Sequence, residues 1–127
     1  MTRSHAIGTW ALSALVALTF VVTGSSKLAA VPPSPQNFAR WGLSPTFMHV
    51  IGAVEVLAGL GLLVPRVAPL AALVLIVTMV GALRTGIVFG EMLHVAVPSV
   101  LLVALAAIVY LRRDSLSRLL GRTPRSG

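Results

Sequence analysis

One carboxylate lies inside a membrane-length apolar stretch of this sequence. Residues 48–64 read MHVIGAVEVLAGLGLLV, with Glu55 near the middle. An ionised carboxylate close to the centre of a bilayer is costly, so it must be protonated, paired with a cation, or turned toward other helices. A carboxyl group whose pKa is raised by burial can also act as a general acid or base.

Glycines flank this acid on the same side of the expected helix. At about 100° per residue, Glu55 shares a helix face with Gly52 and Gly59. Because glycine has no side chain beyond hydrogen, a neighbouring helix or a bound molecule can come close to the backbone beside the acid. Two interpretations stay open: a tight helix contact with one satisfied acid, or a functional carboxylate.

Several other polar residues lie near one end of the expected spans. Lys27 and Arg84 are natural counter-ions for Glu55, although both could equally anchor at lipid headgroups. His94 could carry a proton beside Glu55, or simply be hydrogen-bonded. The candidate catalytic residues are therefore Glu55 and His94, and the candidate ligand-binding residues are Lys27, Trp41, Gly52, Glu55, Gly59, Arg84 and His94.

Other kinds of site are not indicated. The sequence has no cysteine, which excludes disulfides, thiolate nucleophiles and cysteine-ligated metals. The histidines and acids do not have the spacing of a metal site, so no metal is expected. No nucleophile elbow, phosphate loop or dinucleotide fingerprint is present.

The composition indicates the elements that must position these residues. Of the 127 residues, 57% are hydrophobic and 10% are charged, and the mean hydropathy is +0.96. A water-soluble domain of this size would not have these values. The sequence predicts an all-α protein, a four-helix transmembrane bundle in a single domain, with spans at about residues 6–28, 46–64, 67–84 and 92–111.

One long connection separates the first two spans. It opens in a proline-rich turn, and in its second half Phe38, Trp41 and Leu43 alternate with polar residues. This pattern predicts a short amphipathic helix in the first outer loop, which could be an aromatic anchor at headgroup level or a lid over a cavity. Ser44 and Pro45 are typical of a helix N-cap and first helical position.

Basic residues are distributed unevenly between the two ends of the spans. One side has seven, including Arg66 and those of the tail at residues 112–127, while the other has Lys27, Arg40 and Arg84. The positive-inside rule therefore predicts a multi-pass protein of the plasma membrane with both termini in the cytoplasm. The basic tail suggests anionic lipid headgroups as partners, and no nucleic acid is expected.

Three segments, together with a proline-containing last span that ends in Arg112 and Arg113, resemble the small DoxX-like membrane proteins. The three segments are FVVTGSSKLAAVPP at residues 20–33, NFARWGLSPTFMHVIGAVEVLAGLGLLVPR at residues 37–66, and MVGALRT at residues 79–85. The resemblance implies a four-helix membrane bundle, with relatives linked to quinone-coupled sulfur oxidation, redox-stress membrane complexes and receptor chaperoning. Because those roles differ, fold analogy alone cannot choose among them.

Three functions are compatible with these residues. The first is an outward-facing intramembrane polar pocket, centred on Glu55, that binds a small lipophilic molecule such as a quinone or another isoprenoid lipid. The second is a membrane-embedded enzyme in which Glu55 is the general acid or base and His94 or Lys27 is the relay. The third is a non-catalytic subunit or chaperone-like partner of a larger membrane complex, in which Glu55 only stabilises the bundle. The partners expected besides lipids are a second copy of the chain, in a homo-oligomer, or another protein of a membrane complex.

Overall fold

The structure is a computed structural model that describes residues 3–113, with side chains from residue 6 onward. All of its regular elements in this range are helices, so the predicted all-α class is confirmed. Four long helices and one short helix follow one another along the chain: α1 (Arg3–Leu28), α2 (Ser34–Arg40), α3 (Pro45–Gly61), α4 (Ala68–Phe89) and α5 (Leu93–Leu111).

Local sequence signals explain most helix ends. Helix α1 ends at Leu28, shortly before two prolines that cannot continue a helix. Helix α3 begins as expected, because the side chain of Ser44 accepts a hydrogen bond from the Phe47 amide at 3.1 Å. The short helix α2 occupies the first connection, where the alternating aromatic residues predicted it.

Two helices end at other residues than the approximate ends expected for the spans. The third span was expected to end at residue 84, but α4 continues to Phe89 and ends at Gly90, whose φ of 65° is left-handed. The amides of Gly90 and Glu91 then bond back to Ile87 and Gly86, which is a Schellman motif. Helix α3 ends at Gly61 instead of residue 64. The amides of Leu63 and Val64 bond back three residues, to Leu60 and Gly61, in tighter turns that precede Pro65.

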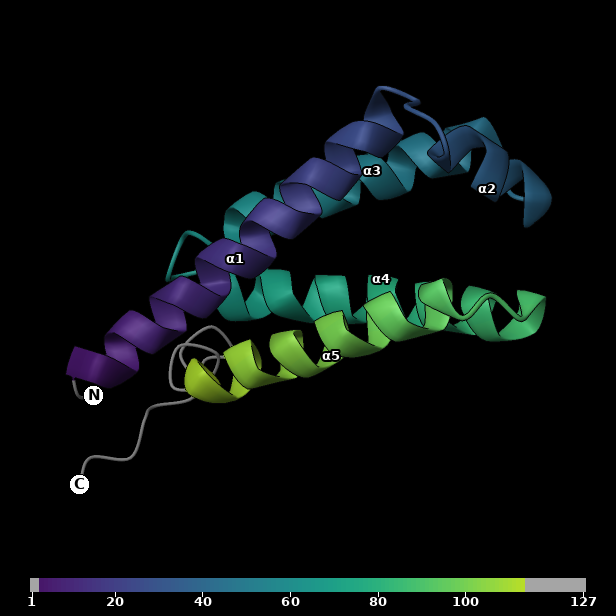
Figure 1. Cartoon of the computed structure of the whole chain (residues 1–127). Coiled ribbons are helices and arrows are strands. Elements are labelled where there is room, and N and C mark those ends of the chain that lie inside the picture. The colour runs from purple at the N-terminus through teal and green to yellow at the C-terminus, as the bar shows by residue number, and fades with distance from the viewer. Residues whose placement is uncertain (1–2, 114–127) are drawn as a thin grey trace.

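The four long helices run up and down in chain order (Figure 1). Helix α1 packs mainly on α3, and α4 packs mainly on α5. One end of the molecule holds α2 and the α4–α5 turn, and we call it the α2 end. The opposite end holds the start of α1, the α3–α4 turn and the end of α5, and we call it the terminal end.

The two helix pairs meet at the terminal end and separate toward the α2 end (Figure 1). The buried core lies where they meet and consists of Val16, Ala17, Phe20, Leu62, Ala71, Ala72, Leu75, Met79, Leu105 and Ile108. Toward the α2 end, the space between α1 and α5 is therefore not closed by this core.

The outer surface of the described helices is apolar. Leu57, Val77 and Val103 are 71–73% exposed, although each is a large hydrophobic residue. Helices α1, α4 and α5 are long and apolar enough to cross a bilayer, and α3 is a shorter apolar helix of 17 residues. Exposed apolar faces on helices of this length belong in lipid, so the chain is a membrane protein.

Candidate functional site

The carboxylate of Glu55 is buried between α1 and α3. Its side chain is 2% exposed, and its Oε1 atom lies 2.7 Å from Nζ of Lys27. The hydroxyl of Thr23 donates a hydrogen bond of 3.0 Å to the other oxygen, Oε2. The expected counter-ion is therefore Lys27, one turn beyond Thr23 on the same face of α1.

Glycines allow the two helices to approach closely enough for this ion pair. A Cβ atom added to Gly24 would lie 2.6 Å from the carbonyl oxygen of Gly52. A Cβ atom on Gly52 would lie 2.9 Å from Cβ of Lys27. Gly59, two turns further along α3, packs against Phe20 and Ala17 of α1. The glycine face predicted around Glu55 is thus a helix contact, with the acid inside it.

A second carboxylate, Glu91, collects polar groups at the α2 end. Its Oε1 atom lies 2.6 Å from Nε of Arg40. Its Oε2 atom accepts a hydrogen bond of 3.2 Å from the indole of Trp41 and lies 3.1 Å from Nδ1 of His94. We call Arg40, Trp41, Glu91 and His94 the Glu91 cluster, and it joins α2 to the start of α5.

Hydrogen bonds favour the ionised form of Glu91, and a ring contact positions His94. The hydrogen bond from Arg40 lowers the pKa of Glu91 below its usual range, and the hydrogen bond from Trp41 acts in the same direction. The Trp41 and His94 rings meet edge to face, with centroids 4.9 Å apart. The cluster therefore holds the imidazole of His94 in a defined position.

The residues expected to form one pocket lie in different places. Lys27, Gly52 and Glu55 are together, whereas Trp41 and His94 belong to the Glu91 cluster. Among the described residues, neither of these two rings forms a hydrogen bond or ion pair with Glu55. Arg84 lies within α4 and is exposed, since that helix is longer than expected. Among the described residues it forms no ion pair with Glu55 or Glu91.

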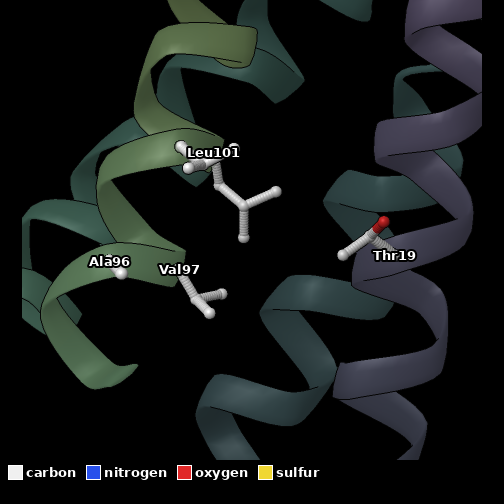
Figure 2. A pocket seen from close by; sticks show the side chains of 5 residues that line it. Thr19, Ala96, Val97 and Leu101 are labelled. Carbon is white, nitrogen blue, oxygen red and sulfur yellow. The ribbon is translucent and has the colours of Figure 1, made fainter. Parts of the chain in front are cut away.

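A cavity of about 260 Å³ lies between α1 and α5. Thr19 lines it from α1, and Leu101 and Val97 face it from α5 (Figure 2). Ala96 and Val100 complete the lining. The Thr19 hydroxyl donates to the Leu15 carbonyl of its own helix at 2.9 Å. The lining is consequently apolar, unlike the polar pocket that the sequence led us to expect.

Both polar groups lie further along the helices that line this cavity, toward the α2 end, and none of their residues is part of the lining. Thr23 is one turn from Thr19 on α1, in the direction of the α2 end. His94 precedes Val97 and Leu101 by three and seven residues on α5, so the three share one face. The cavity therefore has the Glu55 ion pair beyond it on one wall and the Glu91 cluster beyond it on the other.

The terminal end has a separate buried cation. The Arg112 side chain is 8% exposed, and its Nη2 donates to the Ser13 hydroxyl at 3.4 Å. The guanidinium lies 5.1 Å from the centroid of the Trp10 ring. Burial lowers the pKa of Arg112. This contact fastens the end of α5 to α1, while the rest of the expected basic tail, residues 114–127, lies outside the described residues.

Sequence reasoning missed Thr23, Glu91 and the residues that line the cavity. Thr23 could have been found, because it lies on the mildly polar face of α1 that also carries Lys27. Glu91 could not have been assigned, because its cluster depends on where α4 stops. The cavity residues carry no signal, since apolar residues occur along the whole of α1 and α5. No group of three or more metal-ligating side chains occurs within residues 3–113.

Comparison with known proteins gives one match. A family model described as the DoxX-like family matches residues 11–108, which is more than half of the chain. No curated protein and no solved structure matches.

Proposed function

The chain belongs to the DoxX-like family, and from this premise we propose that it binds a small lipophilic molecule, of the quinone or isoprenoid kind, within the membrane. The ligand body occupies the cavity between α1 and α5. Its polar end is directed toward the α2 end, where the Glu55 ion pair and the Glu91 cluster lie. The proposal retains the expected kind of ligand and moves its body from Glu55 to the neighbouring apolar cavity.

The observation that carries this proposal is the cavity itself. This volume of about 260 Å³ exceeds the roughly 150 Å³ of an enclosed apolar core that admits a benzene ring. Unlike that core, the cavity is open on its outer side, where Val97 and Val100 are 54% and 68% exposed. It is somewhat smaller than a drug-sized site, which typically has about 300 Å³ or more. A single substituted ring or a short prenyl segment fits this volume.

The polar residues nearby suit orientation of a ligand better than catalysis on it. The carboxylate of Glu55 is 2% exposed and already has Lys27 and Thr23 as partners. A general acid or base must come within hydrogen-bond reach of its substrate, and Glu55 could do so only if these partners moved. Binding is therefore the better supported function, and the enzyme remains the alternative.

Native mass spectrometry of the purified protein, followed by lipid extraction, tests the proposal. We expect a copurifying isoprenoid or quinone, or micromolar binding of added menaquinone-4 or farnesol. Val97→Trp fills the cavity and should abolish binding. Val103→Trp is the matched control, because Val103 is on the same helix, is 73% exposed and does not line the cavity.

Two outcomes would contradict the proposal. One is a protein that neither carries nor binds any tested isoprenoid or quinone. The other is binding that Val97→Trp and Val103→Trp reduce equally, since this would place the ligand on the general lipid-facing surface. In either case a purely structural subunit of a membrane complex would become the better explanation.

A further inference from the structure

His94 lies one turn before Val97 on α5, between the cavity lining and the α2 end. One of its two ring nitrogens faces a carboxylate. Its Nδ1 atom is 3.1 Å from Oε2 of Glu91. An ionised carboxylate only accepts hydrogen bonds, so the nitrogen facing it carries the proton. In the neutral imidazole the other nitrogen, Nε2, then bears a lone pair and is an acceptor.

The neighbours of Glu91 keep its carboxylate ionised, as the Nδ1–H tautomer of His94 requires. Its other oxygen lies 2.6 Å from Nε of Arg40, and Trp41 donates to Oε2. Two donors besides His94 therefore keep the carboxylate ionised and fixed in orientation. The arrangement resembles the carboxylate–histidine pairs in which a second group sets the tautomer of the ring.

The acceptor nitrogen of His94 is available to a ligand. The His94 side chain is 38% exposed. Among the described residues, Nε2 has no hydrogen-bond partner. His94 also shares its helix face with Val97 and Leu101, which line the cavity.

We propose that Nε2 of His94 accepts a hydrogen bond from a hydroxyl group of the bound lipophilic molecule. This inference rests on the proposed function and narrows its ligand to a prenol or a hydroquinone. A hydroxyl can donate to Nε2, whereas the oxygens of a quinone or an ether can only accept. Glu91 acts as a positioning residue, because it selects the tautomer without contacting the ligand.

The preference for a ligand with a hydroxyl group over one without it should be modest. A neutral hydrogen bond contributes enough to change affinity by about fivefold. The protein in lipid nanodiscs should therefore bind farnesol about fivefold more tightly than farnesyl methyl ether, which has the same chain without the donor. The measurement is competition of the two probes for one reporter lipid.

Three variants locate the effect. His94→Phe keeps an aromatic ring beside Trp41 but removes the acceptor, so it should bind both probes equally. Glu91→Gln removes the fixed acceptor that sets the tautomer and should weaken the preference. His49→Phe, a histidine of α3, is the control and should keep the wild-type preference.

A spectrum gives a readout that does not depend on ligand binding. Nitrogen-15 shifts of labelled histidine distinguish the Nδ1–H tautomer, the Nε2–H tautomer and the cation, and His94→Phe identifies the signal of His94. We expect Nδ1–H in the wild type and a mixture of tautomers in Glu91→Gln.

The results distinguish the hydrogen bond to His94 from the binding of a lipophilic molecule as such. Equal binding of farnesol and its ether by the wild type, an unchanged preference in His94→Phe, or an Nε2–H tautomer would each overturn the inference while leaving lipophile binding intact. Failure of both probes to bind would instead overturn the proposed function, and the spectrum would still decide the tautomer of His94.

Discussion

The Glu55 carboxylate is neutralised within its own pair of helices. Lys27 supplies the charge and Thr23 supplies a hydrogen bond, and all three side chains meet between α1 and α3. A charge pair removed from water is stabilising only while both members are present, because either one alone is an uncompensated buried charge. The pair therefore fixes the register of α1 against α3.

This leads to a prediction about single and double replacement. Lys27→Met should lower the free energy of unfolding by roughly 3 kcal/mol, since it leaves Glu55 without its cation. The double variant Lys27→Met with Glu55→Met should recover most of that loss, because no buried charge remains. Unfolding in mixed detergent and SDS micelles measures both, and a double variant no more stable than the single one would contradict the explanation.

Residue-scale features differ in how far the sequence could predict them. The partner of Glu55 could be predicted, because few cations border the spans and Lys27 lies on a small, polar helix face. The partner of His94 could not, since it depends on the left-handed Gly90 that ends α4 and places Glu91 beside α5. The site roles of these residues remain predictions.

At the scale of elements, contacts between backbones determine how the helices pair. Gly24 and Gly52 meet where α1 crosses α3, and Gly86 lies against the His94 carbonyl where α4 meets α5. Side chains larger than hydrogen at these positions would separate the helices. Apolar periodicity alone predicts that four helices form, but these close approaches decide which of them are partners.

Glycine substitutions should therefore have position-dependent effects. Gly52→Ala should destabilise the protein by about 1–3 kcal/mol, because the new Cβ would lie 2.8 Å from the Gly24 carbonyl oxygen. Gly81→Ala should be neutral or slightly stabilising, since nothing lies within 4 Å of its Cβ position and alanine favours helix. The same micelle unfolding assay compares them, and equal losses would contradict the α1–α3 contact.

Most helix ends could be predicted from the sequence, but the end of α4 could not. The ends of α1 and α5 and the start of α3 were predictable from proline, from the Ser44 cap and from the apolar run. The end of α4 was not, because a charged residue and a glycine, Arg84 and Gly86, are typical of a loop although both lie inside the helix. Its exposed position lets Arg84 extend toward the interface without breaking the helix.

At the scale of the whole molecule, two helix pairs are joined in different ways at their two ends. At the terminal end they share the buried core. At the α2 end, within the described residues, the Glu91 cluster links α2 to the α4–α5 turn and to α5. The first junction is apolar and the second is ionic, so they respond to different conditions.

The ionic junction should open in acid. Because Arg40 lowers the pKa of Glu91, the contact contributes stability above the usual glutamate pKa and loses it as the pH falls from there through the lowered value. Spin labels at Ala39 and Met92 should give a longer and broader distance distribution at about pH 3 than at about pH 7. Glu91→Gln should remove this pH step, and a step of the same size in that variant would assign the change to another group.

The orientation in the membrane is a further prediction. The terminal end carries most of the basic residues, so we expect it in the cytoplasm and α2 outside. The sequence contains no cysteine, and single cysteines at Ser34 and Arg66 can therefore be labelled without background. A membrane-impermeant maleimide added to whole cells should label the first and spare the second, whereas labelling of both would contradict the up-and-down topology.

The separation of the helix pairs also has a mechanical consequence for the surrounding bilayer. Because the pairs touch at one end and diverge toward the other (Figure 1), the protein is a wedge that displaces more area from one leaflet than from the other. A wedge imposes curvature on a flat bilayer and is accommodated with less stress in one already bent toward its wide end. A molecule in the cavity between α1 and α5 would keep the helix pairs apart at the wide end. Ligand binding would therefore depend on the lateral pressure in the leaflet that surrounds this end.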